Sequence, residues 1–413
     1  MTERFSMSMQ RIERIAPGIF LFVLPFTHTT PLRLLCLALS LIILVASVAL
    51  NGTRRAHFVA PPPFFLAALA LWFFVCLIAC FSSSDPSYSW GEFRNEVAYP
   101  LVAFSVFYWL TDSAAARRTW CAILLASFFA ISLLAIGNSL KNHEWLRSSL
   151  VGDRNAYSTY VVLMFPFLML MLTSAARSRW SRAALGAAMV LALVSGGLTL
   201  NRNLWIALAA ETLVFGSLIF ARSRAGTTRK ISWRHILLIT IGMLVFSTSF
   251  LLVNREKSLL VNDPKQTQLG FSQDPRLEIW TYAGEFIRQR PMTGYGYGRG
   301  ILRKEFRTHF ADPLKWHGHN VVVNYAIEAG LPGAIAIIGL FAAFYYQSWR
   351  LYRFDGRGSG TGGTPGWHLG AWGLAVLVGI TIKMMTDDIL IRENSLLFWS
   401  MFGMTWARAS SRA

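Results

Sequence analysis

Long apolar runs separated by short polar connections make up most of the chain. A helix needs roughly 20 mainly apolar residues to cross a bilayer, and about twelve stretches approach or reach that length. We expect membrane-spanning helices near residues 15–29, 31–50, 62–82, 97–112, 119–139, 156–175, 183–200, 204–221, 235–254, 332–350, 368–386 and 393–408. The predicted fold is therefore an all-α integral membrane protein.

The polar connections alternate in composition. If the N-terminus is cytoplasmic, the cytoplasmic connections hold the basic residues Arg54, Arg55, Arg117, Arg118, Arg177, Arg179, Arg182, Arg222, Arg224, Arg229, Lys230, Arg234, Arg350, Arg353 and Arg357. Few acids accompany them, and cytoplasmic loops of membrane proteins have this excess of Lys and Arg. The pattern predicts a multi-pass protein with both termini in the cytoplasm.

One outer connection is far longer than the others. Residues 255–331 form a hydrophilic insert between the ninth and tenth predicted spans, and loops of this length usually have a function. We therefore divide the chain into spans one to nine (1–254), an outer loop with active-site elements (255–331) and spans ten to twelve (332–413). The three parts are expected to form one integrated membrane domain.

The composition agrees with a membrane protein. Of the 413 residues, 54% are hydrophobic and 15% are charged, and the mean hydropathy is +0.43, whereas soluble domains have roughly 25% charged residues. A net charge of +18 suggests nucleic acid in a soluble protein. Here the cytoplasmic clusters account for most of the excess, so we expect no nucleic-acid partner. The four cysteines lie in or at the start of apolar stretches and indicate neither a disulfide framework nor a zinc site.

The outer loop contains a predicted helix and a glycine-rich run. Asp274 can cap a helix that has Pro275 at its first position and ends before Pro291. Arg276 and Trp280 would share one face of it. The run Gly294–Gly300 either cradles a phosphate or forms a tight turn that packs the loop on the membrane surface. It does not follow a strand, so it is no dinucleotide-binding fingerprint.

Two histidines follow in the segment Lys315–Asn320. Asn320 is expected to cap a helix over 321–329, which places His319 just outside a helix N-terminus. The positive end of the helix dipole disfavours imidazolium, so His319 would have a neutral nitrogen that can accept a proton. A metal site of His317 and His319, with His309, is an alternative, and so is a loop histidine without a catalytic role.

Charged residues also occur at the outer ends of several spans. The three places are Asn201-Arg202-Asn203, Gly152-Asp153-Arg154-Asn155 and Thr386-Asp387-Asp388. Ionisable groups at membrane depth are candidates for function. The alternatives are that Arg202 extends to the interface and that the acids are ordinary loop residues.

At these residues the chain resembles the O-antigen ligases, a family grouped with the O-antigen polymerases. The resemblance covers the central and C-terminal two-thirds and rests on Asp153–Asn155, Thr199–Arg202, Arg276 with Trp280, Arg290–Gly296, His319-Asn320 and Glu328–Gly330 with Gly333. The order of these elements, their common face, the twelve spans and the large outer loop match the family. Asn201 departs from the Ser of many members, and Val321–Val323 replaces a run that often contains leucine.

The resemblance implies an inverting, metal-independent glycosyltransferase of the C-type membrane fold, without a cofactor, in the bacterial inner membrane and active on its periplasmic face. Its donor would be O-antigen on undecaprenyl diphosphate, and its acceptor a sugar hydroxyl of lipid A–core. The resemblance assigns the diphosphate to Arg202 and Arg276, whose planar guanidinium groups suit its oxygens, and the role of general base to His319. Substrate binding is assigned to Arg154, Asn155, Asn320, Asp388, Trp280 and Tyr295.

Other functions fit part of the pattern. An O-antigen polymerase would use the same donor with a second lipid-linked glycan as acceptor. A transporter or lipid flippase would usually show repeats and charges near mid-membrane. Here the charges lie at one face and no repeat is visible, which favours an enzyme over a transporter or a membrane scaffold.

Overall fold

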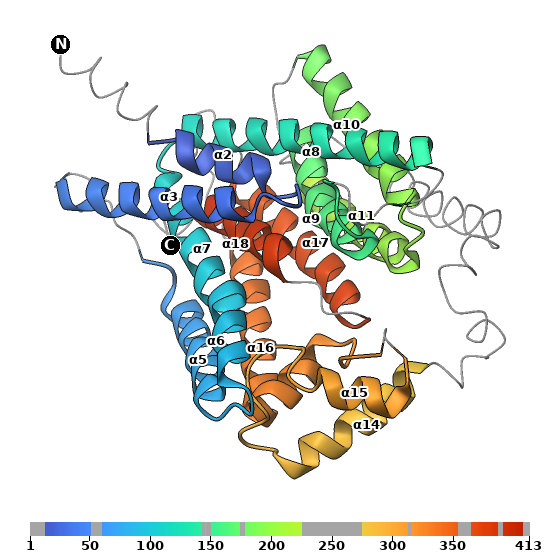
Figure 1. The fold of residues 1–413 in the computed structure, drawn as a ribbon. Coiled ribbons are helices and arrows are strands. Elements are labelled where there is room, and N and C mark those ends of the chain that lie inside the picture. Colours follow the sequence, from blue (N-terminus) through green and yellow to red (C-terminus); the bar gives the residue numbers. More distant parts are fainter. Residues whose placement is uncertain are drawn as a thin grey trace.

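The computed structural model of the chain describes residues 13–50, 60–142, 145, 150–173, 178–224, 275–312, 315–353, 365–386 and 391–407. Apart from the π-helix η1 (Arg94–Ala98), the elements are α-helices: α2 (Ile15–Val23), α3 (Thr30–Leu50), α5 (Pro63–Phe81), α6 (Pro86–Phe93), α7 (Tyr99–Leu110), α8 (Ala114–Asn142), α9 (Arg154–Thr173), α10 (Arg179–Gly197), α11 (Arg202–Arg224), α14 (Pro275–Gln289), α15 (Arg303–Phe310), α16 (Val321–Arg353), α17 (Gly366–Met384) and α18 (Arg392–Trp406). The described chain is therefore all-helical (Figure 1).

Eight of these helices are long and apolar enough to cross a membrane, namely α3, α5, α8, α9, α10, α11, α16 and α17. They confirm the prediction of a multi-pass all-α membrane protein and match eight of the predicted spans. The predicted spans 15–29, 97–112 and 393–408 contain the shorter helices α2, α7 and α18. In the second case α6, η1 and α7 follow one another without a break. The predicted span 235–254 lies outside the described residues.

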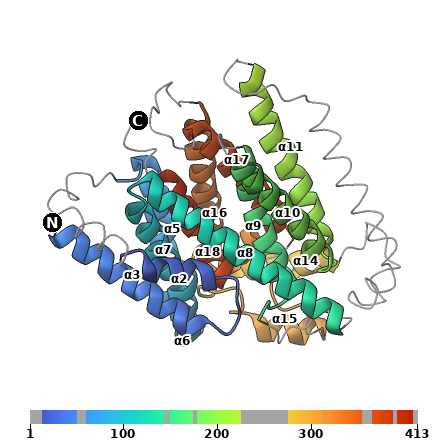
Figure 2. The ribbon, with the colours of Figure 1, turned by 90° about the horizontal axis from the view of Figure 1, so that it is seen from above.

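The helices form an interior set and a peripheral set. In the apolar stretches of α9 and of α17, 83% of the residues are buried inside the protein, whereas in α5 the share is 28%. Figure 2 shows α9 inside the bundle and α3 at its edge. Large apolar side chains are exposed on the peripheral helices, for example Leu35 and Ile42 on α3 and Phe74 on α5. In a membrane such side chains face lipid, so their exposure is expected.

Glycines on α17 permit its close packing. A Cβ at Gly370 would collide with the backbone of α16 at Ser348 and Tyr352, and one at Gly379 would collide with the carboxyl group of Glu211 on α11. Small residues of this kind let transmembrane helices approach closely. They place α17 between α16 and α11, which brings the outer ends of the three helices together.

The described part of the outer loop packs as a small unit beside the bundle. The helices α14 and α15 lie next to each other near the start of α16 (Figure 1), and their apolar faces bury Ile279, Ala283 and Phe306. The predicted loop helix is confirmed: α14 begins at Pro275 and ends at Gln289. Its predicted cap, Asp274, lies outside the described residues.

Candidate active site at the outer ends of the helices

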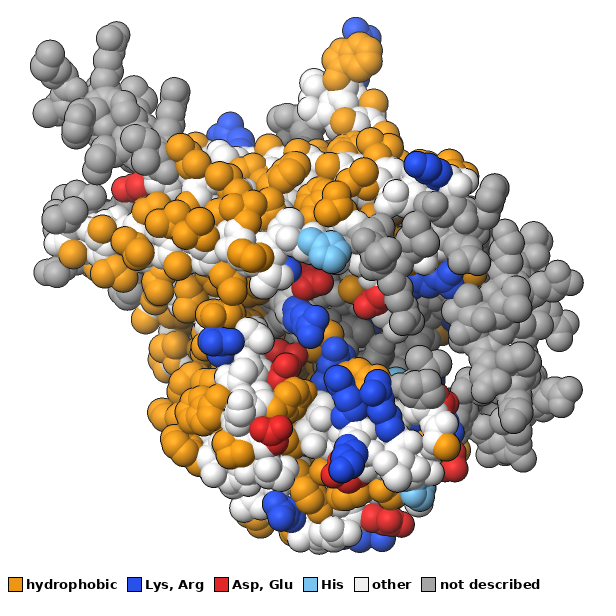
Figure 3. Space-filling view, viewed as in Figure 1, with side chains coloured by type: hydrophobic (Ala, Val, Ile, Leu, Met, Phe, Trp, Pro, Cys, Tyr) orange, Lys and Arg blue, Asp and Glu red, His pale blue; other side chains and the backbone are white. Residues whose placement is uncertain are grey.

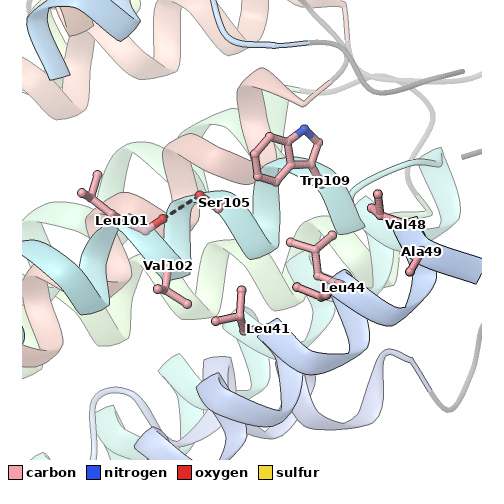
Figure 4. A pocket seen from close by; sticks show the side chains of 9 residues that line it. Leu41, Leu44, Val48, Ala49, Leu101, Val102, Ser105 and Trp109 are labelled. Atoms are coloured by element: carbon pink, nitrogen blue, oxygen red, sulfur yellow. Dashed lines mark hydrogen bonds between the residues drawn. The ribbon is translucent and has the colours of Figure 1, made fainter. Parts of the chain in front are cut away.

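One hollow in the described part of the molecule is apolar and is lined by no group suited to catalysis. It has a volume of about 520 Å³ and lies between α3 and α7, lined mainly by Leu and Val side chains (Figure 4). The hydroxyl of Ser105 donates to the carbonyl of Leu101 in its own helix, 2.8 Å away. The chemically useful residues are found elsewhere, at the ends of α9, α11, α16 and α17.

A hydrogen-bond network joins the starts of α9 and α11 to the end of α17. Asn201 Nδ2 donates to Asn155 Oδ1 at 2.8 Å and to Ser158 Oγ at 3.1 Å. Lys383 Nζ, on α17, donates to the same Ser158 Oγ at 2.9 Å. Asn155 and Asn201, both singled out from the sequence, are therefore direct neighbours.

Arg202 is the first residue of α11 and projects from this network. Asn201 Oδ1 accepts the backbone N–H of Asn203 at 3.1 Å and so caps the helix. Leu200, at φ 55°, makes the tight turn that precedes it. The Arg202 side chain is exposed. The capped helix start holds its backbone, while its guanidinium group remains accessible to a ligand.

The histidine segment has the predicted cap. Asn320 Oδ1 accepts the backbone N–H groups of Val322 and Val323 at 2.9 and 3.2 Å. The helix it caps breaks at Ala329 and Gly330, which confirms the predicted end of this segment. His319 lies directly before Asn320, with φ 46°, a conformation that is rare for residues other than glycine and often found at functional sites.

The two histidines have different environments. The backbone N–H of His319 donates to Nδ1 of His317 at 3.0 Å, and the two rings are 3.9 Å apart between centroids. His317 is buried, whereas His319 is half-buried. His309 stacks instead on Tyr282 at 3.8 Å. His317 therefore supports the backbone of His319 from a buried position, and His319 is the more exposed ring and the better candidate to meet a substrate.

The end of α17 connects the arginine and the histidine. Thr386 Oγ1 accepts from Asn203 Nδ2 at 2.7 Å, and the preceding carbonyl of Met385 accepts from Asn320 Nδ2 at 3.4 Å. Two consecutive residues thus contact the neighbours of Arg202 and of His319. Asp387 and Asp388 follow directly in the sequence and lie outside the described residues.

Trp280 attaches the loop helix α14 to the histidine segment. Its Nε1 donates to the carbonyl oxygen of Gly318 at 2.8 Å, and the ion pair between Lys315 and Glu278, 3.0 Å long, spans the same two segments. Arg276 is half-buried one turn earlier on α14. Through its bond to Gly318, Trp280 positions the histidine segment.

The glycine-rich run joins the outer loop to neighbouring parts of the protein through its backbone. The backbone N–H groups of Tyr295 and Gly296 donate to the carbonyls of Ile327 and Glu328, both at 2.9 Å, and that of Gly300 donates to the Tyr88 hydroxyl at 2.9 Å. Gly294 and Gly296 have φ values of 63° and 123°. A Cβ at either would collide with neighbouring protein. These amides are already used within the protein, which favours the tight-turn interpretation.

Tyr295 is held by this joint. Its hydroxyl lies 2.9 Å from Gln289 Oε1, and its ring packs on α14. Burial raises the pKa of Tyr295, and the nearby Arg290 lowers it to a smaller extent. The phenol therefore stays neutral at ordinary pH and is no candidate for a base.

Two residues of the network, Ser158 and Lys383, were not singled out from the sequence, while Asn203 and Thr386 were named only as parts of the clusters at the span ends. Lys383 left a signal, since it is a single cation inside the apolar stretch 368–386. The hydroxyl of Ser158 gave none, because it resembles many others near helix ends. Arg154 opens α9 next to Asn155 and is half-buried.

Comparison with known proteins agrees with the resemblance seen in the sequence. Residues 162–338 match a family model described as O-antigen ligase. The matched segment runs from α9 through α11 and the outer loop into α16, and so includes Arg202, Arg276 and His319. No curated protein matches the chain significantly. Residues 162–338 are thus similar to the O-antigen ligase family.

Proposed function

We propose that the protein transfers O-antigen from undecaprenyl diphosphate to a sugar hydroxyl of lipid A–core on the periplasmic face of the inner membrane. Two contacts at the end of α17 support this most. Thr386 accepts a hydrogen bond from Asn203, which follows Arg202 in the sequence, and Met385 accepts one from Asn320, which follows His319. In this proposal, a cationic group for the leaving diphosphate and a proton acceptor for the attacking hydroxyl act in one site.

In the proposed reaction the acceptor hydroxyl attacks the anomeric carbon of the donor sugar. His319 takes the hydroxyl proton as the new C–O bond forms. The bond between the anomeric carbon and the diphosphate oxygen breaks with inversion, and the electron pair stays on the diphosphate. Arg202 and Arg276 stabilise that charge, an effect that is commonly the largest in such catalysis.

The remaining predicted residues have supporting roles in this proposal. Asn155 is exposed and can contact substrate beside Asn201, whereas the buried Asn320 supports the site by capping α16. Arg154 and Asp388 bind substrate at the rim. Trp280 acts through the histidine segment. No cofactor is required, and the substrates reach the site from the membrane, where both are anchored.

A transfer assay with purified protein tests the proposal. Lipid-linked O-antigen would be mixed with lipid A–core or with a second lipid-linked glycan, with and without a chelator. A ligase gives product with lipid A–core only, and chelator has no effect. Product with the second lipid-linked glycan alone would mean an O-antigen polymerase, and transport of the donor without product would mean a flippase.

The orientation has its own test. A reporter fused after Lys265 should be periplasmic, and one fused after Gly226 should be cytoplasmic, because Arg222 and Arg224 precede the latter site. The reverse result at either position would place the proposed site on the wrong face of the membrane.

A further inference from the structure

Two arginines of the outer loop are placed on one tryptophan close to His319. The Cζ atoms of Arg299 and Arg303 lie 5.0 and 4.1 Å from the ring centroid of Trp316. The Trp316 ring is 4.2 Å from that of His317, which in turn is 3.9 Å from that of His319. A continuous row of ring contacts therefore leads from the two guanidinium groups to the proposed base.

The backbone at both arginines is fixed. Arg299 lies between Gly298, at φ 115°, and Gly300, whose N–H donates to the Tyr88 hydroxyl at 2.9 Å. Arg303 is the first residue of α15, and its N–H donates to the Gly300 carbonyl at 3.0 Å. The guanidinium of Arg303 is exposed and that of Arg299 half-buried. The backbone of both residues is thus held in place, and the guanidinium group of Arg303 is open to solvent.

The charge of the surroundings favours an anion. Figure 3 shows Lys and Arg side chains gathered over the middle of one face, between the helices of the bundle and the outer loop. Planar guanidinium groups bind phosphate and carboxylate through paired hydrogen bonds.

We propose that Arg299, Arg303 and Trp316 form an acceptor subsite that binds a phosphorylated sugar of the acceptor glycan. This inference rests on the proposed function. The row of rings places the subsite on the side of His319, which contacts the acceptor hydroxyl, whereas the donor diphosphate is assigned to Arg202 and Arg276. A phosphate held by the pair, with its sugar against the indole face, would orient a hydroxyl toward His319.

The test compares acceptors with and without phosphate. Arg299→Gln and Arg303→Gln should each raise the apparent KM for a phosphorylated acceptor about tenfold, the size of one charged hydrogen bond, and leave KM for the dephosphorylated acceptor and for the donor unchanged. Trp316→Leu should raise KM for both acceptors, and Trp316→Phe should do so less. Lys304→Gln and Arg307→Gln, exposed cations on the same α15, are matched controls and should have no effect.

Direct binding separates this inference from the proposed function. Phosphorylated core oligosaccharide, free of its lipid, should bind the purified wild-type protein more tightly than Arg303→Gln, even if no transfer is detected. Equal losses with both acceptors would show that the pair is structural and would overturn the inference. An unchanged ratio of the two KM values in the Arg299→Gln/Arg303→Gln double variant, or a loss of donor binding, would overturn it as well.

Discussion

The two arginines of the proposed site have different kinds of support. Arg202 extends from the ends of transmembrane helices, where short polar side chains such as Asn201 and Ser158 form hydrogen bonds across three helices. Arg276 lies on a loop helix that is held by an aromatic cluster and by backbone contacts of the glycine-rich run. His319 lies where the two regions meet.

The difference predicts how each region responds to change. A network of single hydrogen bonds is sensitive to the loss of one side chain, because the groups that were bonded to it stay buried without a partner. Aromatic packing is spread over many contacts, so that losing one of them changes the position of the loop little. Substitutions around Arg202 should therefore have larger effects than comparable substitutions around α14.

The largest effect is expected at His319. His319→Ala should reduce transfer roughly 100- to 10,000-fold, as expected for loss of a general base, and leave donor binding intact, because the base contacts the acceptor. Initial rates of transfer, with donor binding measured separately, provide the measurement.

His317 is the natural control for this prediction. Its Nδ1 supports the backbone of His319, so His317→Ala should be milder, and chelator should affect neither variant. Equal losses in both variants combined with inhibition by chelator would support the metal site instead of a base.

Next in size is the loss of a guanidinium group. Arg202→Ala and Arg276→Ala should each cost roughly 3 kcal/mol of transition-state stabilisation, on the order of 100-fold in rate, by analogy with a lost oxyanion donor. Arg202→Lys should restore little, because a point charge does not replace a planar fork. Rates are compared at equal amounts of folded protein in the membrane. Full activity of the lysine variants would mean that only net charge matters.

A smaller loss is expected where the network is weakened behind Arg202. Ser158→Ala removes the oxygen shared by Asn201 and Lys383 and should weaken donor binding by about 1–3 kcal/mol, while Arg202 remains present. Ser105→Ala is the control, since that hydroxyl donates to the carbonyl of Leu101 in the same helix. If the two serine variants bind donor equally well, the network does not position Arg202.

The smallest effect is expected in the loop. Trp280→Phe keeps the packing of α14 but removes the bond to Gly318, worth about 1 kcal/mol. It should lower the transfer rate only severalfold and leave donor affinity unchanged. A loss as large as that of Arg202→Ala would show that the loop is as sensitive as the helix ends, and the comparison would fail.

Local patterns predicted much of the structure. Hydropathy located most spans, Pro275 and Pro291 bounded α14, and Asn320 marked the start of α16. The network of Ser158, Asn203, Lys383 and Thr386 depends on which helix ends meet, and that is set by packing, such as the contact of Gly379 with Glu211. Hydropathy contains no such information. The glycine-rich run likewise allowed two interpretations until the acceptors of its amides were known.

The meeting of α11 and α17 beside His319 is the central feature of this account, and cross-linking tests it most directly. Asn203→Cys and Thr386→Cys, in a chain whose four native cysteines are replaced, should be joined by a short cleavable bismaleimide, because the native side chains lie 2.7 Å apart. Cross-linking should stop transfer, and cleavage should restore it. The control pair is Asn203→Cys with Ser178→Cys. It should not react, because Ser178 precedes α10 and Asn203 lies beyond the other end of that helix. Equal reaction of both pairs, or no cross-link in an active Asn203→Cys/Thr386→Cys protein, would contradict the proposed site.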